Sequence, residues 1–126
     1  FYPNYRLVRD GAYIAAKFLE LVAERSASEL VAPYEDYYNV RINLEYDEEA
    51  ELTAMVNAAA DYADSADATP NTTDGYRLDY GDAWVLVRPS GTEPKVRVYA
   101  EGRSEERATE LAEDAADALR SAVATL

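Results

Sequence analysis

The stretch AWVLVRPSGTEPKVRVYAEG, residues 83–102, constrains the possible folds of this chain more than any other segment. Ala83–Arg88 is an apolar run that ends on an arginine and is predicted to be a short strand, and polar and apolar residues alternate in Lys95–Glu101, which is the pattern of a half-buried β-strand. Because the loop Pro89–Pro94 between them is short and contains glycine, the two strands are predicted to pair as an antiparallel hairpin. The alternation assigns three residues of the second strand to each face of a sheet: Val96, Val98 and Ala100 to one, and Lys95, Arg97 and Tyr99 to the other.

Further elements are predicted on both sides of this hairpin. Apolar residues recur with helical spacing over residues 10–25 and 47–66, which predicts two helices, and Asp10 is expected to cap the first. A third helix is predicted to begin after Ser104. Alternation predicts strands over 37–46 and 76–80, with Gly81-Asp82 as a two-residue turn. Residues 68–75, ATPNTTDG, have the composition of a loop. Trp84 alternates with Leu86 and is predicted to lie in the core.

This order of elements predicts an α+β fold. We expect a mainly antiparallel four-stranded sheet in the order β-α-β-β-β-α, with two helices on one face and an extra helix before it. The small, polar segment from Ser26 to Pro33 is predicted to be the boundary, which separates residues 1–33 from residues 34–126. Since the chain opens on FYPNYRLVRDG without a methionine, we expect it to be a piece of a longer protein.

The charge of the chain restricts its partners. There are 25 acidic residues against 12 basic ones, which gives a formal net charge of −13. Such a field repels nucleic acid and anionic membranes, so neither is expected as a partner. Acidity spread along a well-patterned chain is typical of a surface solvated at very high salt, so we expect a halophilic source. An ordinary acidic protein from a mesophile is the alternative.

The residue inventory excludes several kinds of site. There is no cysteine and no histidine, which rules out disulfides, thiolate metal sites, histidine-based triads and histidine-ligated zinc. Asp61, Asp64 and Asp67 are better explained as a solvated helix face than as metal ligands, so no metal site is predicted. No apolar run reaches the length of about 18 residues that a membrane helix needs, and a cytoplasmic location is expected.

The loop of the hairpin is the strongest candidate for a binding site. Ser90 and Thr92 supply hydroxyl donors, and Gly91 is expected to take a positive φ so that successive N–H groups form an anion nest. Arg88 and Arg97 carry permanently charged, forked donors at the two ends of the loop. These residue types together predict a site for a phosphate dianion.

Residue types alone leave other interpretations open. The loop can also be a tight hairpin whose arginines pair with surface carboxylates. A free-standing module that binds phosphorylated ligands fits the same residues. In a third interpretation the chain is a structural interaction domain, in which Arg88 and Arg97 pair with carboxylates of a partner.

The segment RPSGTEPKVRVYAEG resembles the signature of the C-terminal domain of the α-D-phosphohexomutases, the phosphomannomutase, phosphoglucomutase and phosphoglucosamine mutase family. TTDGYRLDYGDAWVLV resembles the two strands before that signature, and YYNVRINLEY resembles the first strand of that domain. FYPNYRLVRDGAYIAAKFLELVAE resembles the end of the preceding, third domain. The resemblance implies a TATA-binding-protein-like two-layer fold for residues 34–126 and makes residues 1–33 the end of the third domain.

The resemblance also implies a function. Arg88, Ser90, Gly91, Thr92 and Arg97 would bind the phosphate of a hexose phosphate, with Glu93 and Lys95 as further candidates. The full enzyme would move a phosphoryl group between C1 and C6 through a phosphoserine, Mg²⁺ and a bisphosphorylated sugar, with the remaining mutase domains in the same chain. The serine loop, the DxDxD-type Mg²⁺ loop and the sugar-recognition loop of the family are not in this sequence. We therefore expect no catalytic residue and no cofactor in this chain, which alone would be inactive.

Overall fold

The computed structural model describes residues 10–126, and its packing divides the chain into two compact units, Phe1–Asp36 and Tyr37–Leu126. In the first unit, helix α1 spans Gly11–Val22, helix α2 spans Ala27–Val31, and a 3₁₀ turn, η1, spans Ala32–Tyr34. The Asp10 carboxylate accepts a hydrogen bond from the backbone N–H of Tyr13 at 2.9 Å, which confirms the predicted cap. Helix α1 ends earlier than the predicted residue 25.

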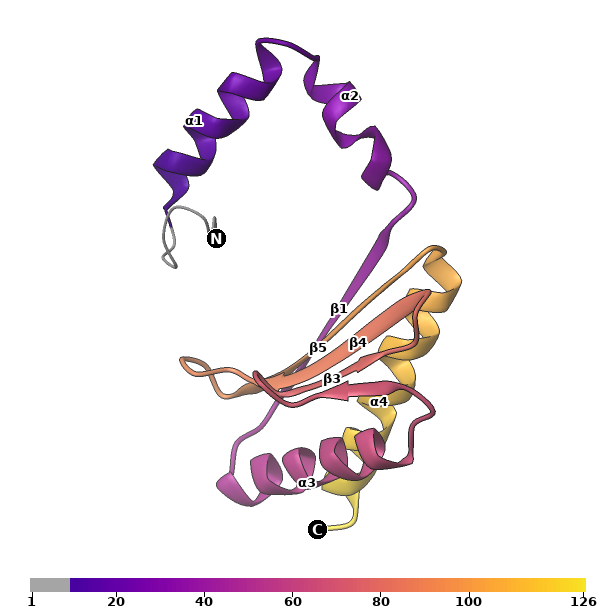
Figure 1. Cartoon of the computed structure of the whole chain (residues 1–126). Helices are drawn as coiled ribbons and strands as arrows, with labels where there is room; N and C mark the ends of the chain where they lie inside the picture. Colours follow the sequence, from indigo (N-terminus) through magenta and orange to yellow (C-terminus); the bar gives the residue numbers. More distant parts are fainter. Residues whose placement is uncertain (1–9) are drawn as a thin grey trace. The chain divides into compact units, whose positions relative to one another are not determined.

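The second unit is a single sheet with two helices. Its strands are β1 (Tyr38–Glu45), β2 (Thr69–Asn71), β3 (Tyr76–Asp79), β4 (Ala83–Pro89) and β5 (Lys95–Gly102). They pair antiparallel in the order β1-β5-β4-β3-β2. Helices α3 (Glu49–Ser65) and α4 (Glu105–Ala124) pack against each other and against the sheet, on the same side of it (Figure 1). The predicted α+β fold is confirmed.

The sheet has one strand more than predicted. Strand β2 occupies Thr69–Asn71, in the segment whose composition indicates a loop, and it pairs only with β3. A proline lacks the N–H that a central strand needs, but an edge strand leaves one side of its backbone unpaired. Pro70 is therefore compatible with this position, and composition alone does not reveal the strand.

Alternation along the hairpin decides which side chains form the core. Val85, Val87, Val96 and Val98 are buried under the helices, where they meet Leu78 of β3 and Leu119 of α4. The intervening residues lie on the opposite side, which we call the open face of the sheet. The prediction for Trp84 is wrong, because it belongs to this second set. Its ring is half-buried under the Arg77 guanidinium, 5.0 Å from the ring centre, and its Nε1 donates to Glu101.

Local signals fix the ends of the elements. The Ser104 hydroxyl accepts from the N–H of Arg107 at 3.2 Å and begins α4, as predicted. Gly81 has a φ of +87°, which suits the first central position of a type II′ turn, and the N–H of Tyr80 donates to the Ala83 carbonyl across it. Within residues 10–126, no helix combines the length and the apolar character needed to cross a bilayer.

Candidate functional site

Two arginines face each other on the open face, where β4 and β5 approach their loop. Arg88 and Arg97 are direct partners in the antiparallel register, and Lys95 lies two residues before Arg97 on the same face. Like charges directly opposite each other destabilise a sheet. The chain therefore needs an anion here, either from its own side chains or from a ligand.

The loop between these strands is held by its own backbone. The N–H of Ser90 donates to the Lys95 carbonyl at 2.8 Å, and the N–H of Lys95 donates to the Glu93 carbonyl at 2.8 Å. The Pro94 carbonyl accepts from Tyr46 at 3.2 Å, which ties the loop to the segment after β1. Among the described residues only Gly75 and Gly81 have a positive φ, so the expectation for Gly91 is wrong. These hydrogen bonds close the loop without a left-handed residue at that position.

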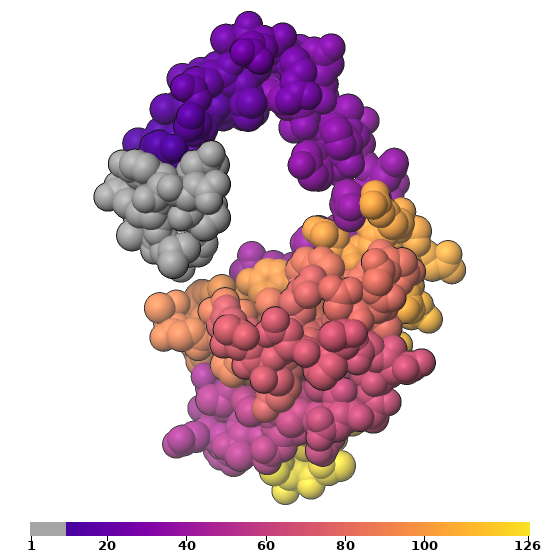
Figure 2. All heavy atoms as spheres, viewed as in Figure 1, coloured from indigo at the N-terminus to yellow at the C-terminus, as the bar shows by residue number. Residues whose placement is uncertain are grey.

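The loop presents donors toward solvent at the end of the sheet. It projects from the second unit in Figures 1 and 2. The Ser90 hydroxyl oxygen accepts from Arg97 Nη2 at 3.1 Å and from the N–H of Thr92 at 3.5 Å, which leaves its own proton to donate. Arg97 Nε is buried and has no partner among residues 10–126. An unpaired buried donor is costly, so an acceptor that reached Nε after a shift of the Arg97 side chain would be favourable.

Carboxylates of the chain itself sit on the three cations. Glu93 lies 2.6 Å from Arg97 Nη2 and 2.9 Å from Lys95 Nζ, and Asp74 lies 2.6 Å from Arg88 Nη1. The hydrogen bond from Lys95, followed by that from Arg97, holds the pKa of Glu93 below its ordinary value. The Tyr99 side chain and then Glu93 raise the pKa of Arg97 above its ordinary value, so this guanidinium stays charged. The tight-hairpin interpretation expects the arginines to pair with carboxylates, and the structure shows such pairs, with Glu93 and Asp74 coming from two loops of this domain.

Asp74 and its glycine were missed by reasoning from the sequence. Gly75 has a φ of +91°, and a Cβ built on it would lie 2.4 Å from the Val87 carbonyl oxygen and 2.7 Å from Arg88 Cβ. Only glycine lets the β2–β3 turn approach β4 this closely, which brings Asp74 to Arg88. The Asp-Gly pair in TTDGYR was the available signal, but its spatial neighbour could not be read from it.

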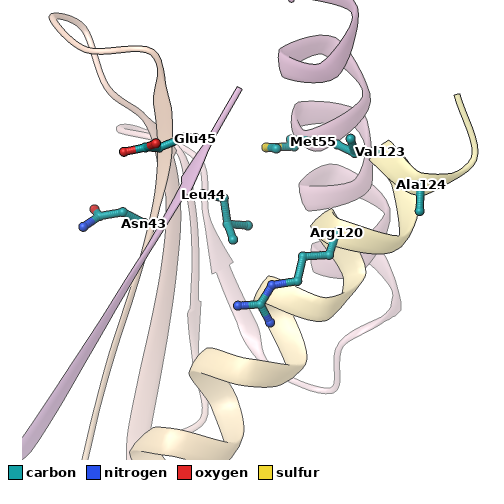
Figure 3. Close-up of a pocket in the computed structure, with 7 residues that line it drawn as sticks. All are labelled: Asn43, Leu44, Glu45, Met55, Arg120, Val123 and Ala124. Carbon is teal, nitrogen blue, oxygen red and sulfur yellow. The ribbon is translucent and has the colours of Figure 1, made fainter. Parts of the chain in front are cut away.

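Other concave regions lack the same chemistry. Figure 3 shows one at the β1 edge, where Leu44 points toward the helices while Asn43 and Glu45 point to the open face. Arg120 lines this hollow, but its guanidinium is already bonded to Glu113 at 3.0 Å and Asp117 at 2.7 Å. No cluster of three or more acidic side chains able to hold a metal occurs in the part of the chain that the structure describes.

Comparisons with known proteins identify the family of this chain. Residues 41–118 match the family model described as phosphoglucomutase/phosphomannomutase, C-terminal domain. A phosphoglucomutase/phosphomannomutase of Thermococcus kodakarensis is 38% identical over 89% of this chain and 25% of its own length. A probable phosphoglucosamine mutase of Methanopyrus kandleri is 38% identical over 97% of this chain and 27% of its own length.

A solved structure shows the same fold. The crystal structure of a phosphoglucomutase/phosphomannomutase family protein from Burkholderia thailandensis superposes with a TM-score of 0.67 and 26% identity, covering 90% of this chain and 24% of that chain. The chain thus spans about a quarter of the length of these relatives.

Proposed function

This chain belongs to the phosphoglucomutase/phosphomannomutase family, and we propose that its C-terminal domain holds the non-reacting phosphate of a hexose phosphate. Arg88, Ser90, Gly91, Thr92 and Arg97 would form the site, and Lys95 would add a third cation. The observation that carries the proposal is the direct pairing of Arg88 with Arg97, beside a donor-rich loop and a buried Arg97 Nε without a partner. A phosphate dianion between the two arginines would supply a counter-charge beyond the carboxylates that already pair with them.

The full enzyme would move a phosphoryl group between the C1 and C6 oxygens of a hexose, with a phosphoserine as donor and a bisphosphorylated sugar as intermediate. The residues of this chain would bind and orient the substrate, because a fixed clamp on one phosphate lowers the entropic cost of reaction at the other end. Residues 10–126 offer no ligand cluster that would fit the Mg²⁺ expected of the full enzyme. Residues 1–33 would belong to the preceding domain, and the other mutase domains would complete the site.

A titration followed by amide shifts in NMR spectra tests the proposal. The chain is titrated in molar KCl with glucose 6-phosphate, mannose 6-phosphate and free glucose. We expect weak shifts centred on Ser90–Thr92 from both phosphates and none from glucose. Equal shifts from glucose, or shifts centred elsewhere, would contradict a phosphate clamp.

Arginine variants sharpen the test. Arg88→Ala and Arg97→Ala each remove charge-assisted hydrogen bonds worth about 1.5–3 kcal/mol, so the dissociation constant should rise about tenfold or more. Arg120→Ala is the matched control, because it removes the same charge from α4, away from the loop, and should leave binding unchanged. Unchanged affinity in Arg97→Ala with an intact spectrum would count against the proposal.

A further inference from the structure

The open face provides anions as well as cations at the proposed phosphate site. Glu93 contacts both Lys95 and Arg97, and Asp74 contacts Arg88, so each of the three cations has a carboxylate within 2.9 Å. Three cations and two carboxylates leave one net positive charge around the loop. A phosphate dianion that joined this set unchanged would leave the site negative, which disfavours binding with both carboxylates in place.

We infer that Glu93 is an internal counter-anion, which occupies the cations of the empty site and is displaced by the phosphate of the substrate. This inference rests on the proposed function and adds a residue that sets the affinity of the site. Glu93 would act against binding rather than for it. Its removal should strengthen phosphate binding, whereas removal of Arg88 or Arg97 should weaken it.

The geometry allows this exchange without movement of the backbone. The N–H of Ser90 donates to the Lys95 carbonyl before the side chain, and the Glu93 and Pro94 carbonyls accept backbone hydrogen bonds after it, so the loop is fixed on either side of the side chain. The Glu93 side chain is 48% exposed, while Lys95 and Arg97 are only 19% and 22% exposed. The carboxylate therefore lies on the solvent side of the cations, and a change of rotamer is enough to release them.

Donors at the site remain available while Glu93 is in place. Glu93 bonds Arg97 through Nη2 only, and Nε of the same guanidinium has no partner in residues 10–126. Ser90 uses its oxygen as an acceptor and keeps its proton. A phosphate can thus begin to bind at the Ser90 hydroxyl and then replace Glu93 on Nη2 and on Lys95.

The inference is tested by Glu93→Gln in the same 126-residue chain. The probe is glucose 6-phosphate at about pH 7.5, where a phosphomonoester with a second pKa of about 6 is mainly dianionic. Since exposed ion pairs contribute modestly, we expect the dissociation constant to fall about three- to tenfold. The gain should shrink as KCl is raised, because salt screens the charge that the substitution uncovers.

Glu45→Gln is the matched control. Glu45 lies opposite Lys95 in the β1–β5 register, and its carboxylate takes no part in the ion pairs found among the described residues. Both substitutions remove one negative charge close to Lys95, but only Glu93→Gln removes a contact with the cations. Affinity in Glu45→Gln should therefore stay within about twofold of the unchanged chain.

A second measurement follows the displacement itself. The side-chain carboxyl carbon of Glu93 should shift on addition of glucose 6-phosphate, and that of Glu45 should not. A shift at Glu93 with tighter binding only in Glu93→Gln would support the inference.

Other results would overturn it. If the unchanged chain binds and Glu93→Gln binds equally or more weakly, Glu93 organises the cations and the inference fails, while the proposed function stands. If Glu45→Gln gains as much affinity for glucose 6-phosphate as Glu93→Gln, the gain comes from the loss of negative charge in general, and the displacement of Glu93 is contradicted. If the unchanged chain shows no phosphate-dependent shift, the proposed function fails and the inference fails with it.

Discussion

At the scale of single residues, the site depends on close approach as much as on charge. Arg88 and Arg97 are brought together by strand register, but the carboxylate on Arg88 arrives from a different turn. That turn fits because Gly75 has no side chain where it passes Val87 and Arg88. One glycine thus determines both local packing and the electrostatics of the site.

Gly75→Ala tests this role. The added methyl would meet the Val87 carbonyl oxygen at 2.4 Å in a backbone conformation of positive φ, so we expect a loss of about 2–4 kcal/mol in the free energy of unfolding. Gly81→Ala is the control, because it has a φ of +87° but nothing within 4 Å, and should cost only about 1–2 kcal/mol. Urea unfolding of both variants measures the difference, and equal losses would show that sterics at Gly75 do not matter.

At the scale of elements, α4 is a helix built for close packing. Its buried face contains four alanines that are fully covered: Ala108, Ala112, Ala115 and Ala116. Small side chains let the helix axis lie near the sheet, while Leu111 and Leu119 fill the remaining space. The position of α4 over β1, β4 and β5 is therefore set by side-chain volume rather than by polar contacts.

Ala115→Leu should disturb this packing. A larger side chain at a position with 0% exposure forces backbone shifts, and we expect a destabilisation of about 1–3 kcal/mol. Ser121→Leu adds an apolar side chain to the exposed side of the same helix and should change stability by less than about 0.5 kcal/mol. Chemical unfolding followed by circular dichroism compares the two. A stable Ala115→Leu variant would mean that the interface between helix and sheet is loosely packed.

At the scale of the whole molecule, charge is unevenly distributed. The chain carries −13 overall, yet Arg41, Arg77, Arg88, Lys95 and Arg97 all lie on the open face of one sheet. The acidic residues are numerous on α3 and α4, which cover the other face. Glu45, Asp79 and Glu101 share the open face, so this face is less acidic than the helical one rather than positive, and a phosphorylated ligand meets less repulsion there.

The net charge predicts a strong dependence on salt. Raising KCl from about 0.1 M to about 1 M shortens the Debye length from about 10 Å to about 3 Å, so repulsion between acidic groups falls and the melting temperature should rise by several degrees. Thermal unfolding measures this directly. The triple change Asp61→Asn, Asp64→Asn and Asp67→Asn, on exposed positions, should raise the melting temperature at low salt and reduce its dependence on KCl. A melting temperature independent of salt would contradict the halophilic interpretation.

Much of the fold and part of the site could be predicted from the sequence, for identifiable reasons. Alternation reports which side chains share a face, so the separation of Val96 and Val98 from Arg97 was predictable. It does not report which face is covered, and Trp84 was therefore assigned to the wrong side. Contacts between segments that are distant in sequence could not be predicted either. The ion pair between Asp74 and Arg88 depends on the approach of two loops, which no local pattern encodes.

The register that places Arg88 opposite Arg97 has a consequence for folding as well. Because side chains alternate, a slip of one residue in either strand of the hairpin would turn its arginine toward the helices. A guanidinium there would meet an apolar core without a partner, at a cost of several kcal/mol. Misaligned hairpins are therefore rejected by the same two arginines that we propose for the substrate. The two arginines proposed to bind the substrate would therefore also favour the correct strand register during folding.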